Sequence, residues 1–317
     1  MDVVALGELL IDFTASGVSS QGNQMYEANP GGAPCNVLSM LQRLGRSTAF
    51  IGKVGQDSFG ERLVAAVKEQ GISSEGICFD EEIPTTLAFV HTAPDGDRTF
   101  SFYRNPGADM MLRKEDINTE LLKNTKVFHF GSLSMTEPGI EETTKYAIDI
   151  AKQSGCLISF DPNLRPRLWK NLEDARKKIA FGFQQCDILK ISDDEITFMT
   201  GEEDIDAGIE KILSKYPIPF VCATMGKRGS KAFFDGKMVE GKPFLQEKTI
   251  ETTGAGDTFC ACMLHYLLEY GIHTIQPKQV KELLEFSNAA ASLITTRKGA
   301  LRVMPRKEEI EELLRKS

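Results

Sequence analysis

The sequence has no run of apolar residues that approaches the roughly 18 needed to cross a membrane as a helix. Its opening segment, MDVVALGELLIDF, lacks the basic start and small-residue cleavage site of a signal peptide and is typical of a buried first strand. The net charge of −8 and the pI of about 5.3 argue against nucleic acid or an anionic membrane as the main partner. We therefore expect a cytoplasmic protein with a small-molecule partner.

Histidines and cysteines are few and dispersed, which argues against a structural metal site. The four histidines are scattered, and the seven cysteines are odd in number and mostly lie in apolar runs. Cys260 and Cys262 form a C-x-C pair, but residues two apart on a helix point to different sides, and zinc normally needs several grouped ligands. The cysteines are therefore expected to be small core residues in a reducing compartment.

The chain contains no repeat, low-complexity tract or linker, so we expect a single domain over residues 1–317. Short apolar segments alternate with amphipathic ones, which is typical of βαβ units on a mostly parallel sheet. The expected strands are 127–131, 156–161, 187–192 and 220–224, and the expected helices are 139–154, 172–185 and 205–215. The fold class is therefore α/β.

One segment departs from this alternation. Residues 85–104 have two β-rich arms around the turn-forming residues 94–97, which predicts a hairpin. The arms carry Phe89, Phe100, Phe102 and Tyr103, more aromatic surface than a two-stranded ribbon can bury. We interpret the hairpin as a lid over a cleft, with packing on the main sheet as the alternative. Its exposed edge also allows pairing with the lid of a second subunit as a homodimer.

The segment ETTGAGDTF at 251–259 indicates a site for an anion. The glycines of Gly254-Ala255-Gly256 allow the turn to direct its amide hydrogens to one point, and apolar residues at helical spacing over 258–270 predict a helix that starts there. Asp257 would repel a resting phosphate but suits a base near a transferring group. The alternative is an ordinary glycine-rich turn with a first-turn acid.

The two commonest nucleotide motifs do not fit this turn. The sequence has no G-x-x-x-x-G-K-[ST], and Phe259 stands where a dinucleotide fingerprint needs Gly or Ala, so a nicotinamide-dependent dehydrogenase is disfavoured. ETTGAGDTF together with PGGAPCNV at 30–37 resembles the paired signatures of the ribokinase-like carbohydrate kinases, nearly collinearly over the whole chain. The resemblance implies a three-layer α/β/α sandwich with a lid from segments near 13–30 and 85–105, and ATP and Mg²⁺ as cofactors.

The resemblance also implies roles for individual residues. Asp257 matches the base that deprotonates the attacking sugar hydroxyl, beside an anion hole formed by Gly254, Ala255 and Gly256. The implied sugar ligands are Asp12, Gly31, Gly32, Asn36, Phe102, Arg104 and Arg165. The implied nucleotide ligands are Lys190, Ser192, Thr224, Gly226, Gly229 and Asn288. Asp12 also stands at the expected end of an apolar strand, where a carboxylate favours a binding role over simple capping of the turn.

Two metal sites follow from the same resemblance. Glu195 matches the acid that organises Mg²⁺ through water, although Ser192 replaces the usual Asn of that motif. Glu251, where relatives usually have Asp, would hold a monovalent cation such as potassium together with Thr253 and Gly299.

Within the family, the segments GELLIDF, GGAPCNV, RTFSFYRNPGADMML and FDPNLRPRLW resemble fructokinases. The expected reaction is transfer of the γ-phosphoryl group of Mg·ATP to fructose, giving fructose 6-phosphate. A 2-keto-3-deoxygluconate kinase is the alternative, because Arg104 and Arg165 could bind a substrate carboxylate or equally hold a phosphate or a lid acid. An aminoimidazole riboside or other ribosyl substrate, and a non-catalytic sensor on the same scaffold, also remain open.

Overall fold

The computed structural model describes residues 1–92 and 98–316 and is built around a nine-stranded sheet. The sheet has the order β13-β12-β11-β10-β9-β8-β1-β4-β5. Neighbours from β11 to β5 are parallel, whereas β12 and β13 are added antiparallel at one edge. The strands are β1 (Val3–Leu6), β4 (Thr48–Gly55), β5 (Ser73–Asp80), β8 (Val127–Gly131), β9 (Leu157–Asp161), β10 (Ile188–Ser192), β11 (Phe220–Thr224), β12 (Ser230–Phe234) and β13 (Lys237–Gly241).

Helices cover both faces of this sheet because its strands are apolar on both sides. Val3 and Ala5 belong to one buried cluster, and Val4 and Leu6 to the other. The first face carries α1 (Ala33–Arg43), α2 (Ser58–Glu69), α8 (Ala255–Tyr270), α9 (Pro277–Ile294) and α10 (Lys307–Lys316). The second carries α3 (Thr119–Lys123), α4 (Pro138–Gln153), α5 (Leu172–Gln185), α6 (Asp193–Thr200) and α7 (Ile205–Lys215). The expected α/β/α layering is confirmed.

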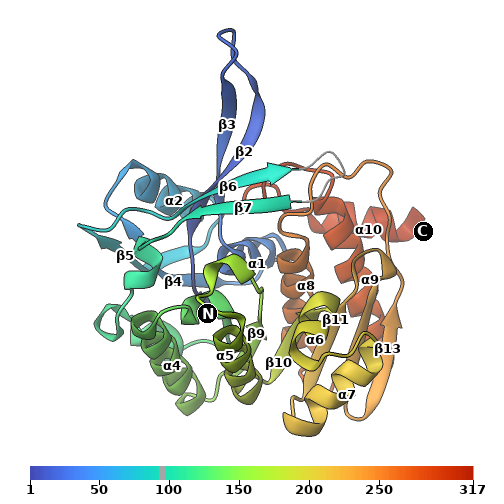
Figure 1. The fold of residues 1–317 in the computed structure, drawn as a ribbon. Helices are drawn as coiled ribbons and strands as arrows, with labels where there is room; N and C mark the ends of the chain where they lie inside the picture. Colours follow the sequence, from blue (N-terminus) through green and yellow to red (C-terminus); the bar gives the residue numbers. More distant parts are fainter. Residues whose placement is uncertain (93–97, 317) are drawn as a thin grey trace.

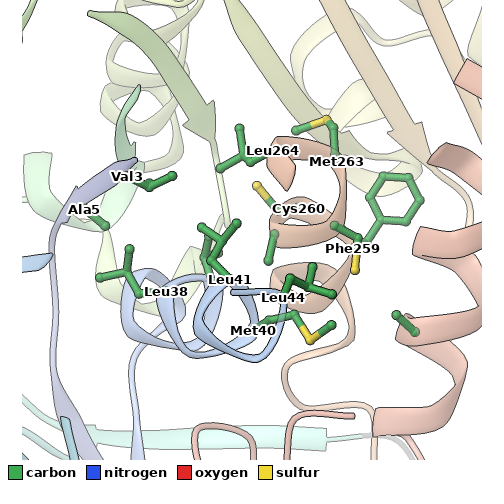
Figure 2. Close-up of a cluster of buried hydrophobic side chains, with 14 of the residues drawn as sticks. Val3, Ala5, Leu38, Met40, Leu41, Leu44, Phe259, Cys260, Met263 and Leu264 are labelled. Atoms are coloured by element: carbon green, nitrogen blue, oxygen red, sulfur yellow. The ribbon is translucent and has the colours of Figure 1, made fainter. Parts of the chain in front are cut away.

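Helices α1 and α8 pack against each other in the first of these cores. Leu38 and Leu41 of α1 lie beside Cys260 and Leu264 of α8, and all four side chains are fully buried (Figure 2). Both cysteine positions of the C-x-C pair are buried and every cysteine is free, as expected for core residues. This packing fixes the beginnings of the two helices relative to each other, and those beginnings carry the two signature motifs.

A second, smaller sheet has the order β3-β2-β6-β7. It consists of β2 (Leu10–Val18), β3 (Gln24–Gly31), β6 (Leu87–Thr92) and β7 (Arg98–Tyr103). β2–β3 and β6–β7 are antiparallel pairs, and β2 joins β6 in parallel. The expected hairpin over 85–104 is confirmed as β6 and β7, although its turn at 94–97 lies outside the described residues. Figure 1 shows β2 and β3 rising from the body of the molecule, with β6 and β7 lying across its top.

The opening segment differs from the prediction of one buried strand. β1 ends at Leu6, the chain turns, and β2 begins at Leu10 in the small sheet. Asp12 therefore lies within β2, opposite Asn29 of β3, and not at the end of a central strand. A continuous apolar run cannot indicate where one strand ends and the next begins, because both strands bury residues there.

The expected helix over 258–270 begins three residues earlier, at Ala255. Glycine is a poor helix former, which hides this first turn in the sequence. None of the described helices is both long and apolar enough to span a bilayer.

Candidate active site

Two clefts meet at the GAGD turn. The first, about 700 Å³, is lined by residues that include Asp12, Gly32, Asn36, Phe102, Arg165, Lys190, Glu195 and Asp257. The second, about 600 Å³, is lined by residues that include Thr224, Gly226, Gly229, Phe244, Leu245, Ala255 and Asn288. Thr252 and Gly256 line both. Thr224, Gly226, Gly229 and Asn288, four of the expected nucleotide ligands, line the second cleft, whereas Lys190 and Ser192, the other two, line the first cleft together with most of the expected sugar ligands. The expected anion hole lies between the two clefts.

The turn Gly254-Ala255-Gly256 begins helix α8 at this junction, and the amide of Ala255 donates to Thr252 O at 3.2 Å. Gly254 is the N-cap of α8 with a φ of 79°, and a Cβ there would lie 2.9 Å from Ala300 Cβ, so both its conformation and its surroundings favour glycine. Thr258 N donates to Gly254 O at 2.8 Å, which closes the first helical turn. The amides of Gly256 and Asp257 lie within that turn, where an α-helix has no internal acceptor for them. This geometry suits an anion.

Asp257 is a buried acid at the same point. Its side chain is 9% exposed, and its Oδ2 accepts a hydrogen bond from Asn36 Nδ2 at 2.8 Å. Burial raises the pKa of Asp257 to about 6, because a charged carboxylate is poorly solvated there. A carboxylate with a pKa just below neutrality is ionised at pH 7 and able to accept a proton, which is what a general base requires.

A second acid, Asp12, faces the first cleft from the small sheet. Burial raises its pKa to about 7, and the positive charge of Arg165 acts in the opposite direction. A Cβ at Gly31 would lie 2.2 Å from Asp12 Oδ2, so glycine makes room for this carboxylate. Gly31 acts by its small size in this structure and does not line the cleft among the described residues.

A third acid, Glu8, was missed by the sequence reasoning. It lines the cleft, is 6% exposed, and its Oε1 accepts from Ala33 N at the beginning of α1 at 2.9 Å. Burial raises the pKa of Glu8 to about 7. The available signal was an acid directly after the buried run VVALG. The backbone of Glu8 also excludes a side chain at Gly32, where φ is 123° and a Cβ would lie 2.3 Å from Glu8 O.

Arg104, an expected sugar ligand, is engaged elsewhere. Its Nε donates to Asp109 Oδ2 at 2.8 Å, and its other nitrogens donate to Thr136 Oγ1 and Leu133 O. Thr86 Oγ1 donates to the other oxygen of Asp109. The Arg104–Asp109 pair is buried at the base of the small sheet, and Arg104 does not line the cleft among the described residues. The arginine thus holds an acid, as in one of the alternatives, although Asp109 lies in the segment after the lid and not in the lid itself.

The second cleft is lined by four of the six residues expected to bind the nucleotide. Asn288 lies on α9 and donates to Ser230 Oγ and Lys242 O, so its orientation is fixed. Phe244 and Leu245 also line this cleft, and Leu245 is 69% exposed. The sequence analysis missed both, because they lie between β13 and α8 in a segment without periodicity.

Lys190 and Glu195 approach the junction from β10 and α6. Lys190 Nζ pairs with Asp161 Oδ2 at 3.1 Å. Burial alone would lower the pKa of Lys190, but the Asp161 carboxylate outweighs it and the pKa is raised. Glu195 accepts from Leu164 N and from Ser192 N, while Ser192 Oγ accepts from Glu195 N, so the pair forms a capping box.

The residues present fit a magnesium ion held mainly by a nucleotide. The described residues contain no cluster of three or more His, Cys, Asp or Glu side chains suited to hold a metal alone. Mg²⁺ usually binds one or two carboxylates, several waters and substrate phosphates. Glu195 and Asp194, both lining the first cleft, supply oxygen donors of that kind.

The expected potassium ligands are partly brought together. Gly299 N donates to Glu251 Oε1 at 2.9 Å, and Gly299 has a φ of 80°. The longer Glu side chain thus reaches the loop at 299 although relatives usually have Asp. The potassium site stays a prediction, which equal rates in potassium and in tetramethylammonium salts would contradict.

Comparison with known proteins agrees with this geometry. Residues 1–307 match the model of the pfkB family carbohydrate kinases. A probable fructokinase-4 of Arabidopsis thaliana is 38% identical over 315 residues, 99% of this chain and 96% of that protein. A fructokinase structure from Vibrio cholerae O395 with fructose, ADP and calcium superposes with a TM-score of 0.89 at 29% identity, covering 99% of each chain. A putative ribokinase II structure from E. coli with ATP and Mg²⁺ gives 0.87 at 25% identity, covering 100% of this chain and 99% of that one.

The fold and the paired clefts define a sugar kinase of the ribokinase-like class. The chain belongs to the pfkB family of carbohydrate kinases.

Proposed function

We propose that the protein is a fructokinase that transfers the γ-phosphoryl group of Mg·ATP to the 6-hydroxyl of fructose. The observation that carries the proposal is the position of Asp257, a buried acid at the junction of two clefts and beside free helix amides. The fructose, ADP and ATP bound by the neighbouring structures support the substrates.

The geometry supports an in-line mechanism. Fructose occupies the cleft of Asp12 and Asn36, and the nucleotide occupies the cleft of Thr224 and Asn288, with its γ-phosphate toward Gly256. Asp257 accepts the proton of the attacking hydroxyl as the new O–P bond forms and the bond to the bridging oxygen of ADP breaks. The amides at the start of α8 stabilise the charge on the transferring group. Bound Mg²⁺ supplies further neutralisation of phosphate charge.

The position of Arg104 favours fructose over 2-keto-3-deoxygluconate. The guanidinium that could bind a substrate carboxylate already binds Asp109 in a buried pair. The first cleft is lined by the acids Glu8, Asp12 and Asp257 as well as by Arg165. A neutral polyol meets the carboxylate oxygens as hydrogen-bond acceptors for its hydroxyl groups.

The function is tested by ADP release with Mg·ATP and a panel of fructose, 2-keto-3-deoxygluconate, ribose, aminoimidazole riboside and glucose. We expect fructose to lead in kcat/KM by tenfold or more, about 1.4 kcal/mol of transition-state preference. A lead by 2-keto-3-deoxygluconate would leave only the family assignment, and no turnover with any sugar would favour the sensor. A change of nicotinamide absorbance would instead support the dehydrogenase.

We also propose that two copies associate through the outer face of the small sheet. Asp12 and Phe102 lie on the side toward the cleft, and the opposite side carries a row of aromatic rings formed by Tyr26, Phe89 and Tyr103. Tyr103 is 65% exposed and Tyr26 is 40% exposed, and exposed apolar surface of this kind is typical of association sites.

Sedimentation velocity of Tyr103→Glu tests this association. We expect a dimer for the unmodified protein and a monomer for Tyr103→Glu, because a charge buried in an apolar interface is costly. Leu172→Glu, at an exposed apolar side chain on α5 outside the small sheet, is the control and is expected to remain dimeric. A monomeric unmodified protein at micromolar concentration would contradict the proposal.

A further inference from the structure

Asn36 and Asp257 form a buried contact between the two signature motifs. Asn36 is in α1 and Asp257 in α8, 221 positions apart, and Asn36 Nδ2 lies 2.8 Å from Asp257 Oδ2. Asn36 is 3% exposed and Asp257 is 9% exposed. A hydrogen bond to an ionised group is stronger than a neutral one, and more so where water is excluded. The contact therefore acts on the protonation state of the acid as well as on its position.

Neighbouring hydrogen bonds hold helix α1 in place, and the side-chain amide of Asn36 bonds only to the carboxylate of Asp257 among the described residues. Glu8 Oε1 binds the first turn of α1 through Ala33 N, and Ser39 Oγ one turn further on donates to Leu301 O at 2.6 Å. The side-chain oxygen of Asn36 is buried and has no hydrogen-bond partner among the described residues. An ionised carboxylate only accepts hydrogen bonds, so Asp257 requires the NH₂ group to face it. The orientation of the amide is thus set by Asp257.

Several charged or titratable groups surround this pair. They are Glu8, Asp12, His129, Asp161, Arg165 and Lys190. Burial has the largest effect on the pKa of Asp257 and raises it, and the hydrogen bond from Asn36 is the strongest opposing influence. Asp161 raises the pKa of Asp257 further, and Lys190 and Arg165 lower it. Asn36 is therefore the group that most strongly counteracts the effect of burial on the pKa of Asp257.

We infer that Asn36 is the positioning residue of the base: its amide holds the Asp257 carboxylate toward the cleft and keeps it in the ionised form that accepts the hydroxyl proton. The inference rests on the proposed function, in which Asp257 is the base. Asn36 then has two roles, the expected contact with the sugar and a role in the chemical step. The second role affects kcat even at saturating sugar. Asn36 also links the PGGAPCNV motif to the GAGD motif by one hydrogen bond.

The direct test measures protonation of Asp257 without turnover. Ligand-free protein labelled with ¹³C-carboxyl aspartate is titrated by infrared spectroscopy, and the spectrum of Asp257→Asn is subtracted to isolate this one carboxyl. We expect a midpoint of about 6 in the unmodified protein. Asn36→Leu, which keeps the shape of the side chain and removes the donor, is expected to raise that midpoint by about one to two pH units. Arg43→Lys, at the exposed C-terminal end of the same helix, is the control and is expected to leave the midpoint unchanged.

The pH profile of turnover gives the second readout. With saturating fructose, kcat of Asn36→Leu is expected to fall most below neutrality and to recover as the pH rises, because Asp257 then ionises without help. An unchanged infrared midpoint with only a raised KM for sugar would overturn the inference and leave Asn36 as a sugar contact. Asn36→Ala in the same titration decides the point if the leucine variant does not fold. If no sugar is phosphorylated, the proposed function fails. The titration still measures the effect of Asn36 on the pKa of Asp257.

Discussion

Asp257→Asn is expected to lower kcat with fructose and Mg·ATP by roughly a hundredfold to ten-thousandfold, the usual contribution of a positioned general base. The amide has the shape of the carboxylate but cannot take up the hydroxyl proton. KM should change little, because the two clefts proposed to bind the substrates remain. Steady-state kinetics of purified protein, with ADP release coupled to a second enzyme, measures both constants.

Glu61→Gln is the matched control for this substitution. Glu61 is an exposed acid in the first turn of α2, as Asp257 is a first-turn acid of α8, but it lies outside both clefts. We expect it to keep full activity. Asp257→Asn should remain folded, since it removes a carboxylate whose raised pKa shows that the ionised form is disfavoured by burial. A folded Asp257→Asn with most of its kcat would exclude Asp257 as the base.

Asp109→Ala is expected to destabilise the protein by about 3–5 kcal/mol, the effect of removing one partner of a buried ion pair. Arg104 would be left as a buried cation, with side-chain exposures of 4% and 2% for the two partners in the intact pair. Thr86 would lose its acceptor as well. Urea unfolding, followed by circular dichroism, measures the change in free energy.

The exposed pair Glu120–Lys123 supplies the control for this experiment. Its side chains are 70% and 52% exposed, and such pairs contribute about 0.2–1 kcal/mol. Glu120→Ala should therefore be nearly neutral. If Asp109→Ala lowers the free energy of unfolding by less than about 1 kcal/mol, water or a neighbouring acid compensates the charge of Arg104. In that case the guanidinium would also be available to a substrate carboxylate, and the preference for fructose would weaken.

The regular part of the fold could be predicted from the sequence because its signals are local. The helices at 172–185 and 205–215 and the strand at 220–224 begin and end where periodicity and capping indicated. The GAGD segment was recognisable because the backbone geometry at an anion site requires glycine at fixed positions. The glycines of GGAPCN are required for another reason, because side chains there would collide with Asp12 and with the backbone of Glu8. Most of the residues that the resemblance assigned to the two ligands line two adjoining clefts, but among the described residues Gly31 and Arg104 line neither, and Lys190 and Ser192 line the first cleft.

The remainder depends on contacts between distant parts of the chain. The turn between β1 and β2 was hidden because Leu6, Leu9 and Leu10 are all buried, each in a different packing environment. The engagement of Arg104 by Asp109 depends on how the base of the small sheet folds against Leu133 and Thr136. No sequence pattern indicates which of several acids an arginine will contact.

The most direct test of the account is ³¹P NMR of the protein with fructose and Mg·ATP, followed until the nucleotide is consumed. We predict one new phosphomonoester signal, that of fructose 6-phosphate, growing in equal amount with ADP, and growing at least about a hundredfold more slowly with Asp257→Asn under the same conditions. ADP without a sugar phosphate, or a fructose left unmodified while another acceptor on the panel is phosphorylated, would contradict the proposed function.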